Sequence, residues 1–440
     1  MYREKIEILK KWKNSDNRKP LIIRGARQVG KTWLAKEFAA TEYKKVAYIN
    51  FDNNNRMHNL FIGDFDVQRL IQGFKAETSV DINPDDTLII LDEIQEVPKA
   101  LTALKYFYEN APDYNIIVAG SLLGIAMHEG VSFPVGKVDY IKLNPLTFRE
   151  FLLALGEAQL LDLMGEVTDL RLLSVFHDKL IDYLKTYFFL GGMPEVIANY
   201  VAKKSWKEAR EIQNKILYAY NEDFSKHAPP NMVQRIRQAW QTIPAQLAKE
   251  NKKFIYGLVR EGARAKEYEM AIMWMEDAGL IRRLNRIEAP RLPISSYADF
   301  NAFKIYHLDV GLLVAMTNLS EKTLLEKNSI FTEFKGALTE QFVLQELQNH
   351  SNVDICYWAK DGKSRAEVEF IMQIADRIVP VEVKSGVNLR SKSLKIYIEK
   401  YQPQIAIRSS QADYKKTDNL YDVPLYLLDS FAVKNLLSSD

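Results

Sequence analysis

The chain has 440 residues, of which 47% are hydrophobic and 26% charged, as in ordinary folded proteins, so disorder as the main state is excluded. Its 59 basic and 57 acidic residues leave a net charge of +2, which excludes a nucleic-acid binder that works through an overall positive field. The single cysteine, Cys356, excludes an intrachain disulfide framework and a cysteine-based zinc cluster.

Short apolar runs alternate with helical patterns in the first third of the chain. A helix is expected over residues 31–40. The strand candidates are residues 21–23, 46–51, 88–91, 115–119 and 138–143. Nearly continuous apolar strands that alternate with helices are typical of a parallel sheet covered on both faces. We therefore predict an α/β domain that ends near residue 150.

The pattern changes after residue 150. Helical periodicity dominates as far as residue 225 and is broken by Gly191-Gly192-Met193-Pro194. In the mixed segment that follows, we expect a helix over 265–275. It is closed by a turn at Gly279, and a strand follows. The last part contains a long helix and then strands; these are expected at 331–348, 368–372 and 378–383. A chain of this length is expected to form two to four domains.

The turn after the first strand has the pattern G-x-x-x-x-G-K-[ST] of a phosphate-binding loop. Its residues are Gly25-Ala26-Arg27-Gln28-Val29-Gly30-Lys31-Thr32. Glycines let successive N–H groups point at phosphate oxygens, and the helix that follows directs its positive end at the same anion. We expect Lys31 to reach the β- and γ-phosphates of ATP and Thr32 to hold Mg²⁺. The alternative is an ordinary glycine-containing turn.

Two further strand ends carry polar residues that suit phosphoryl transfer. The apolar strand 88–91 ends in Asp92 and Glu93, where Asp92 can coordinate Mg²⁺ and Glu93 can polarise the attacking water. Alternatively, both acids simply begin the next helix, where negative charge is favourable. Ser121 follows the strand 115–119 and is a candidate to contact the γ-phosphate or the water, although a serine is also common in such turns.

Together these residues resemble an AAA+ ATPase, with its Walker A, Walker B and sensor-1 elements. Over nearly its full length the chain resembles bacterial and archaeal AAA-type ATPases with a C-terminal domain of unknown function. The matching stretches are residues 24–32, 91–95, 144–151, 191–195, 303–312 and 381–386. The resemblance implies a P-loop NTPase parallel sheet with a helical lid, followed by a winged-helix and a restriction-endonuclease-like α/β domain. The expected boundaries are 1–155, 156–225, 226–320 and 321–440.

The last domain resembles the PD-(D/E)XK nucleases. Glu382 and Lys384 share one face of a strand, Glu369 lies on the preceding strand, and Glu340 lies on the helix before it. Two of these carboxylates can hold Mg²⁺, and Lys384 can orient water. Glu369 stands where the family usually has Asp, and its longer side chain would shift the metal. The alternative is an inactive nuclease-like fold.

Two other features bear on function. Arg149 is a candidate for the arginine that completes the ATP site in AAA+ proteins, although most surface arginines are simply solvated. Arg282, Arg283 and Arg286 in the winged-helix segment can meet DNA phosphates, or that segment can pack against protein.

We therefore expect an ATP- and Mg²⁺-dependent ATPase whose nucleotide cycle controls a C-terminal winged-helix and nuclease-like module. The alternatives are an ATP-dependent DNA nuclease in defence or repair, and a nucleotide-gated switch that binds a protein partner with negligible turnover. No signal-peptide core and no run of about 18 apolar residues occurs, so we expect a cytoplasmic protein without a membrane span.

Overall fold

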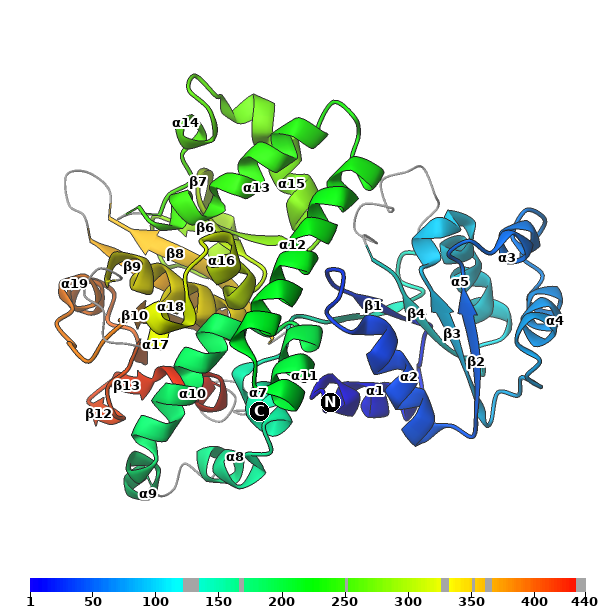
Figure 1. Ribbon diagram of the computed structural model, residues 1–440, viewed down its shortest axis with the longest axis horizontal. Coiled ribbons are helices and arrows are strands. Elements are labelled where there is room, and N and C mark those ends of the chain that lie inside the picture. Colours follow the sequence, from blue (N-terminus) through cyan, green and yellow to red (C-terminus); the bar gives the residue numbers. More distant parts are fainter. Residues whose placement is uncertain are drawn as a thin grey trace. The chain divides into compact units, whose positions relative to one another are not determined.

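A computed structural model describes residues 1–121, 134–165, 170–249, 252–325, 332–349, 353–360 and 366–432 (Figure 1). Contacts within the chain divide it into two compact units. Unit 1 consists of Met1–Asn144 and Trp274–Leu280, and unit 2 consists of Pro145–Met273 and Ile281–Asp440. Within the described ranges, no helix is both long and apolar enough to cross a membrane.

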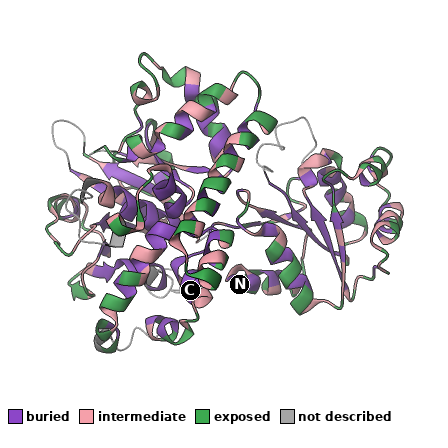
Figure 2. Cartoon of the chain, viewed as in Figure 1, coloured by how far each residue is buried: buried purple, intermediate pink, exposed green. Residues whose placement is uncertain are grey.

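Unit 1 is built on a parallel sheet of apolar strands. Among the described residues this sheet has five strands in the order β2-β3-β4-β1-β5. The strands are β1 (Leu21–Arg24), β2 (Lys45–Asn50), β3 (Thr87–Asp92), β4 (Asn115–Ala119) and β5 (Asp139–Lys142). All five predicted strands are confirmed, and β3 and β4 are buried along their whole length, as Figure 2 shows.

Helices cover both faces of this sheet. Ile89 and Leu91 of β3 pack into one apolar core with α3, α4 and α5, whereas α2 packs on β2, β3 and β4 and contacts α1. Because strand side chains alternate between faces, α1 and α2 lie on the opposite face. These helices are α1 (Lys5–Lys13), α2 (Lys31–Glu42), α3 (Asn55–Leu60), α4 (Val67–Thr78) and α5 (Pro98–Asn110).

Unit 2 begins with the helical region expected from the sequence. Gly191, at φ 71°, ends α10, and Pro194 begins α11. The helices as far as His227 are α7 (Phe148–Ala154), α8 (Ala158–Gly165), α9 (Leu170–Val175), α10 (His177–Leu190), α11 (Pro194–Lys203) and α12 (Trp206–His227). They are clustered with the C-terminal part of the chain rather than with the sheet of unit 1.

The remaining helices lie before, between and after the strands of unit 2. The predicted helix 265–275 is confirmed as α15 (Ala265–Asp277), and the predicted helix 331–348 as α18 (Thr332–Leu347), with residue 331 outside the described residues. The others are α13 (Val233–Leu247), α14 (Tyr256–Val259), α16 (Val310–Met316), α17 (Glu321–Leu325), α19 (Lys392–Tyr401) and α20 (Leu428–Ala432).

A mixed sheet forms the second half of unit 2. In the described part of the chain its eight strands follow the order β12-β13-β11-β10-β9-β8-β6-β7. β6 and β7 lie in the segment expected to form a winged helix, yet they belong to the same sheet as the strands after residue 321. The strands are β6 (Ile281–Ile287), β7 (Ala298–His307), β8 (Val353–Ala359), β9 (Glu367–Ile374), β10 (Arg377–Val383), β11 (Ala406–Ser410), β12 (Lys415–Thr417) and β13 (Leu420–Pro424).

Candidate functional site

The loop between β1 and α2 carries the predicted phosphate-binding residues. A Cβ at Gly25 would lie 2.2 Å from the carbonyl oxygen of Leu143, so only glycine fits where the loop leaves β1. Gly30 is the N-cap of α2 at φ 91° and supplies no side-chain cap. The N–H groups and positive end of α2 can therefore bind an anion, as the sequence pattern predicts.

Lys31 lies against this loop. Its ammonium donates hydrogen bonds to the carbonyl oxygens of Gly25, at 3.0 Å, and Ala26, at 2.7 Å, and the residue is only 8% exposed. Burial lowers the pKa of Lys31 to about 8, while the nearby carboxylates of Glu93 and Asp92 act in the opposite direction. A phosphate group beside this ammonium would offset the cost of burying it.

Thr32 and Asp92, the two predicted Mg²⁺ ligands, are in direct contact. The Thr32 hydroxyl donates to Oδ2 of Asp92 at 2.9 Å, and the backbone N–H of Glu93 donates to Oδ1 at 3.1 Å. Tyr48 on β2 also donates to Oδ2, at 2.9 Å, a contact that sequence analysis missed because it depends on how β2 and β3 pair.

Glu93 is the centre of a polar network just beyond β3. Its Oε2 accepts hydrogen bonds from Gln95, at 2.6 Å, and from the Ser121 hydroxyl, at 3.2 Å, and Arg27 donates to that hydroxyl at 3.2 Å. Burial raises the pKa of Glu93, but the Gln95 hydrogen bond and the charges of Lys31 and Arg27 outweigh it, so the pKa lies below its ordinary value. Glu93 is left-handed, at φ 50°, and is the N-cap of a short 3-10 helix, Ile94–Glu96, to which its side chain gives no capping hydrogen bond.

These residues fit Mg²⁺–ATP in their donor chemistry. Backbone N–H groups and a buried ammonium suit phosphate oxygens, and a hydroxyl beside a carboxylate gives the hard oxygen ligands that Mg²⁺ prefers. Of the residues predicted for this site, the structure brings Lys31, Thr32, Asp92, Glu93 and Ser121 together around the loop. Sequence analysis missed Tyr48 and Gln95.

The four predicted nuclease-like residues also gather, within unit 2. Lys384 lies 2.6 Å from Glu382, and both Glu340 and Glu382 act electrostatically on Glu369. Burial, and then these two carboxylates, raise the pKa of Glu369 to about 8. Nevertheless, in the described part of the chain no group of three or more His, Cys, Asp or Glu side chains is arranged to hold a metal ion.

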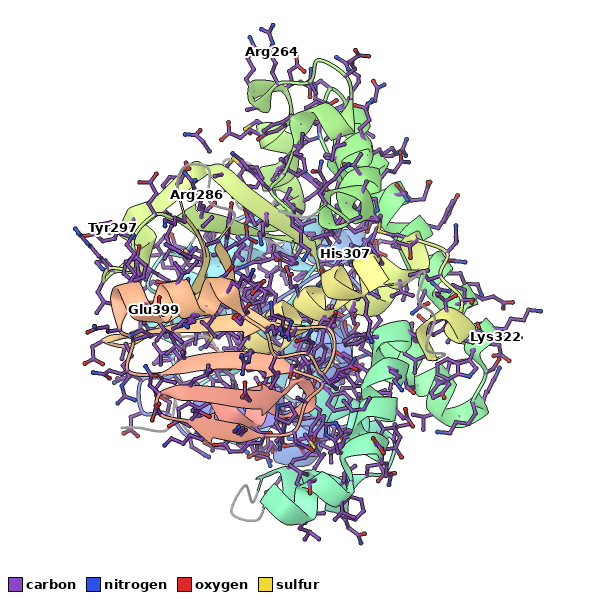
Figure 3. All side chains as sticks on the ribbon, turned by 90° about the vertical axis from the view of Figure 1, so that its left-hand side faces the viewer. Arg264, Arg286, Tyr297, His307, Lys322 and Glu399 are labelled. Carbon is purple, nitrogen blue, oxygen red and sulfur yellow. The ribbon has the colours of Figure 1, made fainter. Side chains whose placement is uncertain are left out.

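Two of the arginines singled out in the sequence, Arg149 and Arg286, have hydrogen-bond or ion-pair partners within unit 2. Arg149 donates to the Ser430 hydroxyl at 3.0 Å, and its role at an ATP site stays a prediction. Arg286 lies 2.8 Å from Asp299 on the neighbouring strand, so its charge is already paired. Arg264, by contrast, is exposed and extends away from the ribbon (Figure 3).

Two of the stretches that carry the family resemblance meet at Asp309. This buried carboxylate accepts hydrogen bonds from the N–H groups of Gly192, at 2.6 Å, and Leu312, at 2.9 Å. A Cβ at Gly191 would lie 2.1 Å from Oδ1 of Asp309, and a Cβ at Gly192 would lie 2.3 Å from the carbonyl oxygen of Leu146, which explains the paired glycines. These stretches therefore join the α10–α11 turn to α16 and build unit 2.

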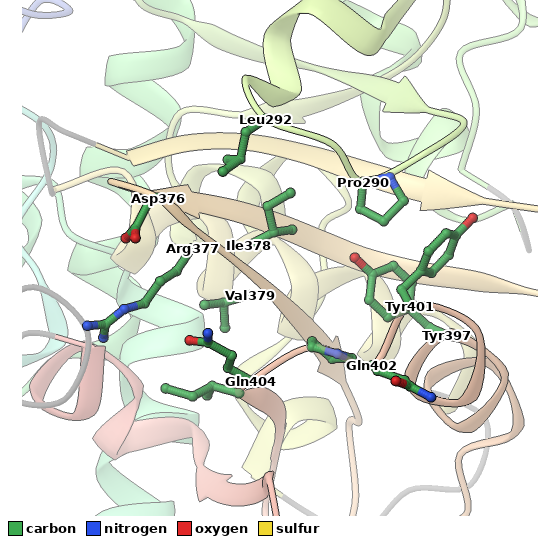
Figure 4. A pocket seen from close by; sticks show the side chains of 12 residues that line it. Pro290, Leu292, Asp376, Arg377, Ile378, Val379, Tyr397, Tyr401, Gln402 and Gln404 are labelled. Atoms are coloured by element: carbon green, nitrogen blue, oxygen red, sulfur yellow. The ribbon is translucent and has the colours of Figure 1, made fainter.

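A pocket of about 250 Å³ lies elsewhere in unit 2 (Figure 4). Asp376 of the β9–β10 turn and Arg377, the first residue of β10, line one end, and Tyr397 and Tyr401 of α19 line the other. It contains none of the residues that the sequence singles out for chemistry.

Comparison with protein families divides the chain into three matched segments. Residues 17–152 match a family described as an AAA domain. Residues 181–323 and 335–428 match two families described as domains of unknown function, DUF8612 and DUF4143. No match is found among curated proteins. The chain thus carries an AAA-family P-loop ATPase domain, and the function of the domains that follow is unknown.

Several solved structures are distantly similar. A Walker-type ATPase of Pyrococcus abyssi has 14% identity and a TM-score of 0.43, with 72% of this chain and 95% of that chain covered. The ORC1 protein of Aeropyrum pernix, solved in complex with DNA, has 11% identity and a TM-score of 0.26, with 71% and 90% covered. Cdc6p of Pyrobaculum aerophilum has 12% identity and a TM-score of 0.24, with 73% and 93% covered.

Proposed function

We propose that this chain, through its AAA-family P-loop domain, is a Mg²⁺-dependent ATPase whose nucleotide cycle controls the C-terminal region. The observation that carries the proposal is the 2.9 Å contact between Thr32 and Asp92 beside a loop whose buried Lys31 points its ammonium at loop carbonyls. This set of a hydroxyl, a carboxylate and an ammonium is what phosphoryl transfer requires.

Each residue then has a definite role. Bound Mg²⁺–ATP supplies the γ-phosphoryl group and the ion that offsets its charge. Lys31 stabilises negative charge on the β- and γ-phosphates, while Thr32 and Asp92 hold the ion. The lowered pKa of Glu93 keeps it ionised, ready to orient a water molecule and accept its proton, and Ser121 lies 3.2 Å away to position that water.

Steady-state ATP hydrolysis tests the proposal. The wild type should turn over ATP in the presence of Mg²⁺, and Lys31→Ala and Glu93→Gln should reduce turnover to background. Lys395→Ala, at an exposed lysine of α19, is the control and should behave as the wild type. Equal background turnover in the wild type and both site variants would exclude an ATPase.

A second candidate is a nucleotide-gated switch that binds a protein partner with negligible turnover. It is favoured by the contacts of Glu93, because Gln95 and Ser121 both donate to Oε2 and compete with water for that oxygen. If this reading is correct, wild-type protein binds Mg²⁺–ATP in calorimetry but hydrolyses it very slowly, and Gln95→Ala increases turnover. Turnover that falls in Gln95→Ala would contradict it.

A third candidate, suggested by the sequence pattern alone, is an ATP-dependent nuclease that acts through Glu369, Glu382 and Lys384, although the described residues include no group arranged to hold a metal ion. Supercoiled and single-stranded DNA, incubated with Mg²⁺ or Mn²⁺ at a stated salt concentration and with or without ATP, tests it. Cleavage that survives in Lys384→Ala would exclude this site as its source.

A further inference from the structure

Four glutamates and three lysines gather in unit 2, more than the nuclease-like pattern requires. Two of the lysines, Lys252 and Lys304, come from the segment before residue 320, and no local sequence pattern connects them with the acids. The members of this cluster are Lys252, Lys304, Glu340, Glu367, Glu369, Glu382 and Lys384.

Lys304 supplies a permanently buried positive charge. Its side chain is 0% exposed on β7, and its ammonium lies 2.5 Å from Oε1 of Glu367 on β9. Burial alone lowers the pKa of Lys304, but the carboxylates of Glu367 and Glu340 reverse this effect and raise the pKa above its ordinary value. The ammonium therefore stays charged and neutralises the acids around it.

Lys252 supplies a second positive charge, which faces Glu340 on α18. It forms an ion pair with Oε1 of Glu340, and the buried Tyr306 hydroxyl donates to Oε2 at 3.1 Å. Both carboxylate oxygens of Glu340 therefore already accept hydrogen bonds from this chain. A divalent ion there would have to displace a partner that carries its own positive charge.

The two remaining acids are also engaged. Glu382 pairs with Lys384 at 2.6 Å and accepts a hydrogen bond from Ser391, and Glu369 accepts one from the N–H of Val383 at 3.1 Å. Mg²⁺ requires several oxygens that converge at nearly ideal octahedral geometry. Here the oxygens face ammonium, hydroxyl and N–H donors instead, so the residues do not fit the metal that the nuclease resemblance implies.

We propose that this cluster is a closed ion-pair network, in which Lys252 and Lys304 supply the positive charge that a divalent metal supplies in a nuclease. The network joins β7 and the loop after α13 to α18 and the β9–β10 hairpin. It predicts that this centre binds no Mg²⁺ or Mn²⁺ and cleaves no DNA. The inference is independent of ATP hydrolysis in unit 1.

Mn²⁺ binding to the full-length, nucleotide-free protein, measured by electron paramagnetic resonance, tests the network. Any Mn²⁺ bound by the wild type should be lost in Asp92→Asn and retained in Glu369→Gln. Lys252→Ala should gain a bound Mn²⁺ that Lys252→Ala combined with Glu369→Gln does not have. Wild-type binding that is lost in Glu369→Gln, or no gain in Lys252→Ala, would overturn the proposal.

Thermal unfolding gives a second, independent measurement. Lys304→Met should lower the melting temperature, because it leaves Glu367 beside other acids without its cation, and adding Glu367→Gln should restore part of the loss. Lys395→Met is the matched control, since the Lys395–Glu399 pair is 77% and 65% exposed and spans 3.8 Å. Equal melting temperatures for the two lysine variants would contradict a stabilising network. If Lys304→Met does not fold, the Mn²⁺ binding measurements on the Lys252 and Glu369 variants test the proposal by themselves.

Discussion

The P-loop region and the carboxylate cluster both surround acidic side chains with hydrogen-bond donors, but they neutralise the acids differently. Asp92 accepts hydrogen bonds from the hydroxyls of Thr32 and Tyr48, whereas Glu340 and Glu367 each face a lysine ammonium. Hydroxyls leave the negative charge for an ion to balance, and ammonium groups do not. We therefore expect the partner of an acid, more than its position in the fold, to decide whether a metal can bind.

The largest expected effect follows from removing the ammonium at the P-loop. Lys31→Ala should lower kcat/KM for ATP by about 10³-fold, because the ammonium no longer stabilises the charge that develops on the phosphates. Lys384→Ala, the corresponding change in the carboxylate cluster, should leave ATP turnover unchanged. Steady-state hydrolysis by purified, folded protein measures both. Loss of turnover in Lys384→Ala would break the distinction between the two regions.

A second change probes the packing on which unit 2 depends. A Cβ at Gly192 would lie 2.3 Å from the carbonyl oxygen of Leu146, and backbone cannot move aside cheaply. Gly192→Ala should destabilise unit 2 by about 4 kcal/mol, measured by urea unfolding. Gly336→Ala is the control: open space surrounds this position on α18, so the variant should be as stable as the wild type or slightly more so. Similar losses of stability in both variants would show that the close approach of Leu146 to Gly192 is not the cause.

The pH dependence of stability should expose two buried groups of unit 2 that act in opposite directions. Burial lowers the pKa of His307 to about 4 and raises the pKa of Asp309 to about 6. As the pH falls from 6.5 to 4, the unfolded histidine gains a proton that the folded one does not, so stability is lost. As the pH falls from 6 to 3.8, the folded aspartate gains a proton first, so stability is gained.

In the wild type these two opposite changes of stability with pH offset each other, and each variant keeps only one of them. Asp309→Asn should lose about 3 kcal/mol of stability between pH 6.5 and pH 4, and His307→Gln should gain stability over the same range. Trp240 lies with its ring centre 4.7 Å from that of His307, so its fluorescence is a local probe of unfolding. Identical pH profiles for the two variants would refute the assignment.

Sequence analysis predicted the first unit better than the second. The strands of unit 1 are short apolar runs, and the P-loop spacing depends only on neighbouring residues, so Lys31 and Thr32 could be located directly. The ion pairs of the cluster join residues 88 positions apart, for Lys252 and Glu340, and 63 apart, for Lys304 and Glu367. Their pairing depends on how β7 and α18 pack, and a local sequence pattern cannot predict that packing.

The same reasoning applies to β6 and β7. A helix, a glycine turn and a strand predict a local helix–strand unit, and the sequence contains each of these parts. Which strand lies beside β6 depends on residues far away in the chain, and the structure pairs it with β8 at Arg286 opposite Tyr357. A single sheet therefore runs through two segments that local pattern treats as separate.

The smallest expected effect concerns Tyr48, the contact of Asp92 that the sequence did not reveal. Tyr48→Phe removes a hydrogen bond to a carboxylate and should weaken Mg²⁺ activation of ATP hydrolysis by about 1 kcal/mol, because Asp92 loses one of the groups that orient it. A Mg²⁺ titration of turnover measures the shift. Tyr43→Phe, which removes a hydroxyl bonded to Asn115 at 3.0 Å, is the control and should leave the Mg²⁺ dependence unchanged. Equal shifts in both variants would mean that Tyr48 supports the fold of unit 1 rather than the ion site.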